Sequence, residues 1–144
     1  MKGKKSMMMK EMVLYYNPNP GPDVAKLKGV LVRMGIRIKN VGPEQVKQKV
    51  GYLAGMPGFA ETDSVDKESE TSIITEEMLV MKNFSSRRID ELLANLKKAG
   101  VPKIALKAVI TEQNSQWTFC QLYEELREEH KAMTRENLTV QENR

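Results

Sequence analysis

Two short runs of apolar residues, 12–16 and 78–81, most constrain what this chain can fold into, because each has the form of a buried β-strand. Each run is followed by apolar residues at helical spacing, a glycine, a second strand-like stretch and a second amphipathic segment. The order strand–helix–strand–helix therefore occurs twice, which we interpret as an internal repeat. The predicted strands are residues 12–16, 36–40, 78–81 and 104–110, and helices are predicted at 24–34, 43–54, 86–99 and 118–131.

Local signals predict several of the helix ends. Gly35 and Gly100 follow the last apolar positions of two helices, where a left-handed residue commonly ends the helix. Thr118 and Gln121 have the spacing of a capping box, and Trp117 stands one residue before the cap, where a hydrophobic staple begins. The start of the last helix is therefore the best-determined local feature of the sequence.

The two halves are expected to share one sheet, because each half alone would leave a pair of strands exposed. The first and third strands are the most apolar and are predicted to be central. Two topologies satisfy this pattern. One is an open parallel α/β sheet with the strand order 2-1-3-4, and the other is a ferredoxin-like antiparallel sheet with two added helices. The helix predicted at 43–54 favours the parallel sheet, because it offers a crossover between the second and third strands.

The domain organisation follows from the distribution of charged residues. We expect a single α/β domain at 12–131, preceded by a flexible basic N-terminus at 1–11 and followed by a flexible polar tail at 132–144. The segment 60–75 is acidic and rich in Ser and Thr, so it buries too little apolar surface to offset its ordering entropy. It is predicted to be a mobile linker between the two halves.

Composition limits the class of protein. The chain has 144 residues with 40% hydrophobic residues and a net charge of +4, which is typical of a globular domain and excludes wholesale disorder. Its apolar runs are shorter than the ~20 residues of a membrane-spanning helix. The single cysteine, Cys120, is typical of a reducing compartment, so we expect a cytoplasmic protein. Three Phe, four Tyr and one Trp offer few stacking platforms, which disfavours nucleic-acid binding.

The second half resembles a small bacterial domain family of unknown function over residues 78–130. The resemblance depends on a hydrophobic strand followed by Phe84-Ser85, Leu92-Leu93, Gly100-Val101-Pro102, Leu106-Lys107-Ala108-Val109, Thr111, Asn114, Trp117-Thr118 and Leu122. The segment from Tyr15 to Pro20 looks like the companion segment of longer members. The resemblance implies a bacterial cytoplasmic protein and brings no known activity, cofactor or partner.

In a parallel sheet, ligands bind beyond the carboxyl ends of the strands where the strand order reverses, which here means the loops 17–23 and 82–88. Three prolines stiffen the first loop and remove backbone donors from it. The second loop places polar and cationic side chains at a helix N-terminus, which favours an anion; the structural alternative is a capped helix with two solvated arginines. The candidate ligand-binding residues are Asn83, Ser85, Ser86, Arg87 and Arg88 from the second loop, with Tyr16 and Asn17 from the first.

Other chemistry is disfavoured by the residues present. Cys120 and His130 are the only residues of their kinds, so the sequence predicts no zinc site, and we expect no cofactor. A catalytic triad is also disfavoured, because His130 lies near the end of the last helix. Lys107 stands in an otherwise apolar strand, which an edge strand with a buried stem explains; the alternative is a desolvated, reactive lysine.

These observations leave two hypotheses for function. The leading one is a non-catalytic module that binds a protein partner or a second copy of itself through a sheet edge or a basic helix face. The alternative is a small-ligand sensor that holds an anion or a nucleotide between the loops 17–23 and 82–88.

Overall fold

The computed structural model describes residues 10–61 and 74–142, with side chains described up to Met133. Most of the predicted basic N-terminus and acidic linker lies outside these residues. A single four-stranded sheet has the order β2-β1-β3-β4, as predicted. The strands are β1 (Met12–Tyr16), β2 (Arg37–Asn40), β3 (Met78–Lys82) and β4 (Leu106–Val109).

The strands of the sheet are not all parallel. β2 runs parallel to β1, and β4 runs parallel to β3, but β1 and β3 are antiparallel, with Leu14 opposite Val80. The prediction of an all-parallel sheet is therefore wrong at the central pair, and the fully antiparallel alternative is wrong at both outer pairs. In its described part, the connection from β2 to β3 contains the short helix α3 (Val50–Leu53) in place of the predicted crossover helix. The chain enters β3 at the end of the sheet where β2 stops.

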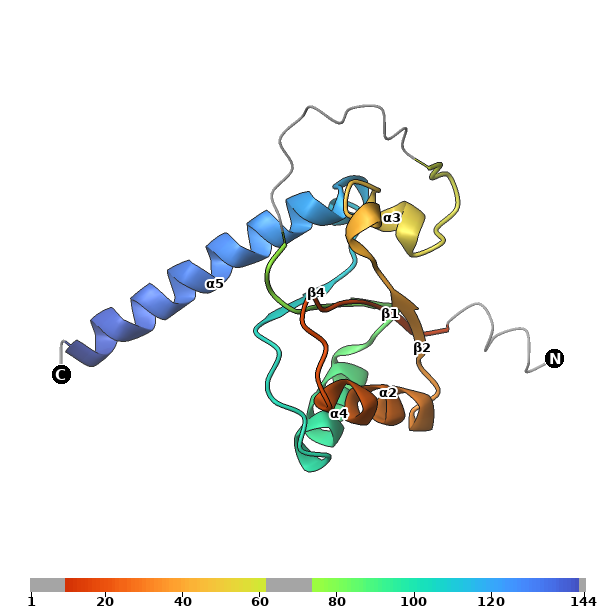
Figure 1. Ribbon diagram of the computed structural model, residues 1–144. Coiled ribbons are helices and arrows are strands. Elements are labelled where there is room, and N and C mark those ends of the chain that lie inside the picture. The colour runs from red at the N-terminus through yellow and green to blue at the C-terminus, as the bar shows by residue number, and fades with distance from the viewer. Residues whose placement is uncertain (1–9, 62–73, 143–144) are drawn as a thin grey trace.

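Helices cover both faces of this mixed sheet (Figure 1). Helix α2 (Asp23–Arg33) and helix α4 (Ser86–Lys98) pack on one face, and α3 and the first turns of α5 (Phe119–Glu142) pack on the other. Short 3₁₀ helices, η1 (Pro43–Gln45) and η2 (Asn114–Gln116), precede α3 and α5.

The helix predicted at 43–54 is two short pieces rather than one helix. Between η1 and α3 the chain turns, and Lys49, which is extended, forms an isolated antiparallel bridge with Thr118. The Val50 N–H donates to the Trp117 carbonyl at 2.8 Å, and the Phe119 N–H donates to the Gln48 carbonyl at 2.9 Å. These bonds tie the starts of α3 and α5 together, and they use the Val50 N–H, which a continuous helix would have bonded to the Val46 carbonyl.

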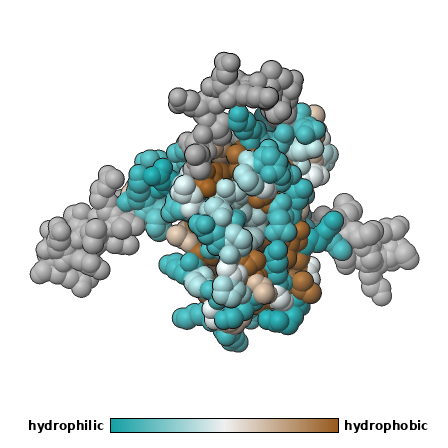
Figure 2. All heavy atoms as spheres, viewed as in Figure 1, coloured by the Kyte–Doolittle hydropathy of each residue, from teal (hydrophilic) through white to brown (hydrophobic). Residues whose placement is uncertain are grey.

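Each face of the sheet has its own hydrophobic core, because successive strand residues point to opposite faces. Val13 and Leu79 lie in the core beneath α2 and α4, whereas Leu14 and Val80 lie in the core beneath α3 and α5. All four side chains are fully buried. Hydrophilic residues cover most of the face shown in Figure 2, with smaller hydrophobic areas between them. The strongly apolar runs of β1 and β3 are thus explained by burial on both sides.

The predicted helix ends are confirmed where local chemistry sets them. Gly35 and Gly100 follow α2 and α4 with φ of 73° and 85°, the left-handed region that glycine adopts at little cost. At the start of α5, the Thr118 N–H donates to Gln121 Oε1 and the Gln121 N–H donates to Thr118 Oγ1, both at 3.0 Å, which is the predicted capping box.

The two halves also form the same hydrogen bonds at corresponding positions. After β2 the Val41 N–H donates to the Tyr15 carbonyl, and after β4 the Ile110 N–H donates to the Met81 carbonyl, both at 2.8 Å. In each half a side chain three residues ahead then accepts from the next backbone N–H. These pairs are Gly42 with Gln45 at 2.9 Å and Thr111 with Asn114 at 2.8 Å.

Helix α5 is longer than predicted and continues to Glu142 instead of ending near Ala132. Its far part extends away from the body of the protein (Figure 1). The sequence from Glu124 to Met133 is rich in Glu, Arg, Lys, Ala and Met, whose high helix propensity supports a helix without tertiary contacts.

Candidate functional site

The loops 17–23 and 82–88 lie at opposite ends of the sheet. Tyr16 is opposite Met78 and Met12 is opposite Lys82, so the carboxyl end of β1 meets the amino end of β3. The prediction that these loops enclose one crevice is therefore wrong, because it required β1 and β3 to be parallel. Tyr16 and Asn17 are separated from the other five candidate residues by the length of the strands.

The loop before α4 is stabilised by its own polar side chains. Asn83 has a φ of 66° and its Nδ2 donates to the Lys10 carbonyl at 2.8 Å. Ser85 caps α4 by accepting from the Arg88 N–H at 3.2 Å. Ser86 and Arg87 are exposed in the first turn of the helix. The structural alternative for this loop, a capped helix, accounts for Ser85, whereas the Asn83 side chain is used by the Lys10 carbonyl.

Arg88 is the centre of an ion-pair network rather than a free cation. Its guanidinium donates to both carboxylate oxygens of Glu11, at 2.8 Å from Nε and 2.7 Å from Nη2. It also donates to Glu91 at 3.0 Å and to the Met34 carbonyl at 2.9 Å. These hydrogen bonds, those to Glu11 above all, raise the pKa of Arg88 above its ordinary value. The side chain joins α4 to the residue before β1 and to the end of α2.

At the opposite end of the sheet, Tyr15 and Tyr16 are both buried, on opposite faces. The Tyr15 hydroxyl donates to the Glu77 carboxylate, and Asn17 Nδ2 donates to that hydroxyl at 2.9 Å. Burial, and then the bond to Glu77, raise the pKa of Tyr15. The Tyr16 hydroxyl donates to the Ile74 carbonyl at 3.1 Å, and burial raises its pKa as well. Both rings are packed because helices cover both faces, so neither forms an open stacking surface.

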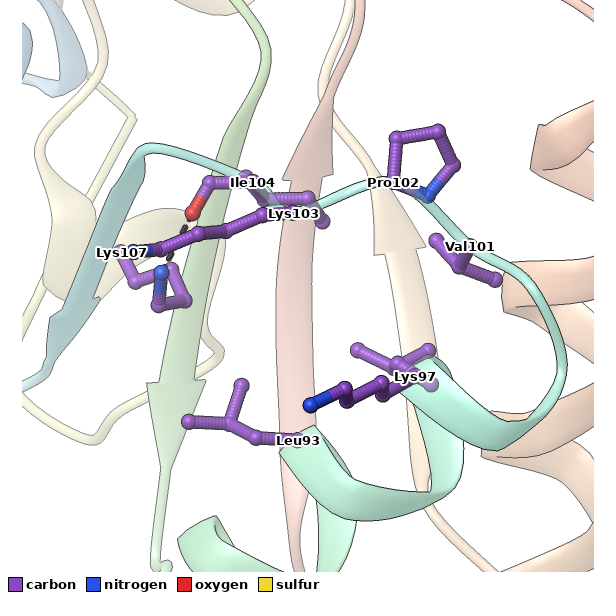
Figure 3. Close-up of a pocket in the computed structure, with 8 residues that line it drawn as sticks. Leu93, Lys97, Val101, Pro102, Lys103, Ile104 and Lys107 are labelled. Carbon is purple, nitrogen blue, oxygen red and sulfur yellow. Dashed lines mark hydrogen bonds between the residues drawn. The ribbon is translucent and has the colours of Figure 1, made fainter.

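A pocket of about 440 Å³ lies beside the edge strand β4, on the face of the sheet that α2 and α4 cover. Its wall is formed by the second half of α4, by the connection from α4 to β4, and by β4 itself (Figure 3). We name it the lysine pocket, because three lysines stand among its apolar side chains. Its lining residues are Leu93, Leu96, Lys97, Val101, Pro102, Lys103, Ile104 and Lys107.

The connection between helix and strand produces this pocket. In the first half, residues 34–36 join α2 to β2 directly, whereas residues 99–105 join α4 to β4. The longer connection carries Pro102 and Lys103 past the end of α4 before the chain enters the strand. The two halves share the hydrogen bonds that follow their edge strands, β2 and β4. They differ in the connection before the edge strand, which is short in the first half, so the lysine pocket is a feature of the second half.

The lysines of the pocket differ in their surroundings. Lys97 and Lys103 are exposed, whereas Lys107 is half-buried. Lys107 Nζ donates a hydrogen bond to the Ile104 carbonyl. Burial lowers the pKa of Lys107, and the positive charge of Lys103 lowers it further. Figure 3 shows Lys103 and Lys107 on the β4 side of the pocket, with Lys97 projecting from α4 on the other side.

The sequence singled out only part of this site. Lys107 stood out as a charge within an apolar strand, and its place on an edge strand agrees with the prediction. Lys97 and Lys103 carried no such signal, because exposed lysines near a helix end are ordinary. The one usable sign was the length of the segment between Gly100 and the next strand, compared with its counterpart after Gly35.

Other groups that could carry chemistry are dispersed. Within residues 10–61 and 74–133, His, Cys, Asp and Glu side chains form no group of three or more that could hold a metal ion. Cys120 is buried in the core beneath α5, and His130 lies on the exposed part of that helix. Of the helices in the described part of the chain, none combines the length and apolar character needed to cross a membrane.

The second half of the chain is similar to a known protein family. No curated protein and no solved structure matches the sequence. A family model matches over residues that include β3, α4, the lysine pocket, β4 and the beginning of α5. Residues 77–133 are thus a DUF3783 domain, a domain of unknown function, as the resemblance to a family of unknown function had indicated.

Proposed function

We propose that this chain is a non-catalytic binding module that holds an anionic ligand with an apolar body in the lysine pocket. The observation that carries the proposal is that Lys103 and Lys107 line the same pocket and that the positive charge of Lys103 acts on Lys107. Two like charges repel, and the residues that line the pocket include no carboxylate to offset them. A bound anion would relieve this repulsion, so the pocket favours a negatively charged group.

The rest of the lining supports a ligand that is more than a simple anion. Pockets that hold small molecules commonly measure about 300–1,000 Å³ and are mostly apolar with a few polar groups. The lysine pocket, at about 440 Å³, has apolar side chains from both α4 and the connection to β4. A phosphate or chloride ion would leave this apolar surface in contact with water. An acid with an aliphatic or aromatic body would cover it, which contributes ~25 cal/mol per Å² of apolar area.

The proposal moves the small-ligand hypothesis to a different place on the molecule. It no longer involves the loops 17–23 and 82–88, whose separation excludes a shared site. The difference between the halves supports the new position, because only the connection at 99–105 is long enough to build the pocket. We also infer that the two halves are an internal repeat, in which the second half has gained this connection.

Binding of a fluorescent amphiphilic anion tests the proposal directly. The probe is 8-anilinonaphthalene-1-sulfonate, and the comparison is N-phenyl-1-naphthylamine, which has the same aromatic body without the charge. We expect Lys103→Met to weaken binding of the sulfonate about tenfold, which corresponds to ~1.4 kcal/mol for one lost ion pair. Lys97→Met should weaken it in the same direction.

The matched control is Lys98→Met. Lys98 adjoins Lys97 in the last turn of α4 but does not line the lysine pocket. Equal losses in Lys97→Met and Lys98→Met would show that the probe senses only the general positive charge of the surface. Equal binding of the charged and uncharged probes would also overturn the proposal.

A second candidate function, docking of a protein partner, is favoured by the outer edge of β4. The Ile110 N–H donates to the Met81 carbonyl on β3. Backbone N–H groups of successive strand residues point to opposite edges, so those of Lys107 and Val109 point away from β3. Such an edge can accept a further strand. Pairing with β4 of a second copy would bring the lysines of both copies together, so charge favours an acidic strand of a partner protein.

Two measurements test this second candidate. Light scattering should show a monomer at low ionic strength, where repulsion between lysines is least screened. A synthetic peptide of alternating Glu and Val should bind, and one of alternating Lys and Val should not. Val109→Pro should weaken binding of the acidic peptide, because proline removes one edge donor. A stable dimer, or equal binding of both peptides, would contradict docking of an acidic strand.

A further inference from the structure

Lys107 occupies a special position among the lysines of the pocket. Its neighbours on β4, Leu106 and Ala108, face the core beneath α5, so the Lys107 side chain lies on the side of the sheet that α4 covers. There it lines the apolar pocket with Leu93 and Ile104 and is half-buried (Figure 3). An amine in such surroundings is less hydrated than one on an open surface.

The hydrogen bond of Lys107 leaves its lone pair available. A neutral lysine amine has two hydrogens and one lone pair. The donation from Nζ to the Ile104 carbonyl uses one hydrogen and positions the nitrogen. The lone pair of the neutral form cannot point at the carbonyl oxygen that accepts this bond, so it is directed elsewhere.

The charged side chains around Lys107 favour its neutral form. The ionisable groups among the pocket residues are Lys97 from α4 and Lys103 from the connection, and both are cations. Burial lowers the pKa of Lys107, and Lys103 acts in the same direction. A desolvated lysine next to a second cation is a recognised form of nucleophilic amine.

We propose that Lys107 binds its ligand covalently, as an imine formed with the carbonyl carbon of a 2-oxo acid that has an apolar body. This inference rests on the proposed function, because it uses the same pocket and the same requirement for an anion. A 2-oxo acid carries its carboxylate directly beside its carbonyl carbon. Lys103 and Lys107 stand on the same side of the pocket and match this pair of groups, with Lys103 holding the carboxylate and Lys107 reaching the carbonyl carbon.

The covalent step requires no further reagent. Neutral Nζ of Lys107 attacks the carbonyl carbon, and a proton moves from nitrogen to the former carbonyl oxygen to give a carbinolamine. Loss of that hydroxyl with a second proton from nitrogen releases one water molecule and leaves a C=N bond between ligand and lysine. The reverse reaction with water restores both partners, so the ligand is held reversibly.

Trapping with phenylpyruvate tests the inference on the full-length protein. The probe is added with sodium cyanoborohydride, which reduces the imine to a stable amine whose added mass is that of the ligand less one oxygen. Peptide mapping by mass spectrometry then gives the labelled fraction of each lysine. We expect Lys107 to be labelled at least about tenfold more than Lys98, the ratio that corresponds to one favourable contact of ~1.4 kcal/mol.

Matched ligands and variants separate covalent reaction from simple binding. 4-Phenylbutan-2-one, which has the carbonyl without the carboxylate, should label Lys107 no more than Lys98. Lys107→Arg should abolish the dominant adduct with an unchanged circular dichroism spectrum, and Lys103→Met should reduce labelling of Lys107 by about tenfold because the carboxylate loses its partner. As the pH is lowered, labelling of Lys107 should persist to a lower pH than labelling of Lys98.

The outcomes distinguish this inference from the proposed function. Displacement of 8-anilinonaphthalene-1-sulfonate by 3-phenylpropionate, which has no carbonyl carbon to react, measures binding alone. Displacement with equal labelling of Lys107 and Lys98 would overturn the imine and leave the binding pocket standing. Absence of both displacement and selective labelling would overturn both proposals.

Discussion

Replacing Arg88 should destabilise the protein far more than its surface position suggests. Arg88→Met keeps most of the aliphatic stem but removes the two hydrogen bonds to Glu11 and the one to the Met34 carbonyl. The Glu11 side chain is only 15% exposed, and that of Arg88 is 30% exposed. The variant would therefore leave a largely buried carboxylate without its cation.

The magnitude lies between two known limits. Breaking a buried ion pair costs about 3–5 kcal/mol, and breaking an exposed one costs about 0.2–1 kcal/mol. The partial exposure of the pair places the expected loss for Arg88→Met at about 2 kcal/mol. The contact with Glu91 is different, because the Glu91 side chain is 48% exposed. Glu91→Gln should cost less than about 0.5 kcal/mol.

Urea unfolding followed by circular dichroism measures both losses. A loss of about 2 kcal/mol should lower the midpoint for Arg88→Met by about 1 M urea, whereas Glu91→Gln should leave it nearly unchanged. In a double-mutant cycle, Arg88→Met and Glu11→Gln should show a coupling of about 1.5 kcal/mol. Equal midpoints for the Arg88 and Glu91 variants, or additive losses in the cycle, would refute the assignment of a structural role to Arg88.

Three further predictions concern the core, a helix cap and a buried phenol. Leu14→Ala should lower the free energy of unfolding by about 3–4 kcal/mol in urea, because Leu14 is fully buried in a central strand; a loss below about 1 kcal/mol would contradict that burial. Thr118→Ala should cost about 1 kcal/mol in thermal unfolding through loss of the capping bond, and an unchanged midpoint would contradict it. The raised pKa of Tyr15 means that the folded protein keeps this proton while unfolded tyrosine ionises near pH 10.0, so stability should fall as the pH rises above that value. Tyr15→Phe should flatten that fall in urea titrations between pH 9 and 11, whereas the same slope in both proteins would count against the shift.

The sequence predicted the strands and their order because burial on both faces leaves a clear apolar signature in β1 and β3. It also predicted the glycines after α2 and α4 and the cap of α5, since these depend on residues within one turn of each other. The direction of β3 relative to β1 was not accessible in this way. The prediction of parallel strands assumed a crossover helix at 43–54, and in the structure this segment instead pairs with residues distant in sequence, as in the bridge between Lys49 and Thr118.

The candidate site was missed for a related reason. Arg88 and Ser85 looked suited to an anion because cations and hydroxyls gather at a helix start, but Glu11 and the backbone of α4 use them. The lysine pocket depends instead on the distance between α4 and an edge strand, set by the connection at 99–105. Residues that are unremarkable one by one, such as Lys97 and Lys103, line one pocket only because that connection brings them together.

The antiparallel pairing at the centre of the sheet has a consequence for the order of events in folding. Each β-α-β half forms from contacts close in sequence, whereas Leu14 must find Val80 across the whole intervening chain. Closing so long a loop is slow, because the chain loses conformational entropy before the contacts between β1 and β3 form and offset that loss. During synthesis the first half therefore emerges before β3, with one edge of β1 lacking its partner strand. We expect the central pair of strands, the most deeply buried part of the protein, to assemble last.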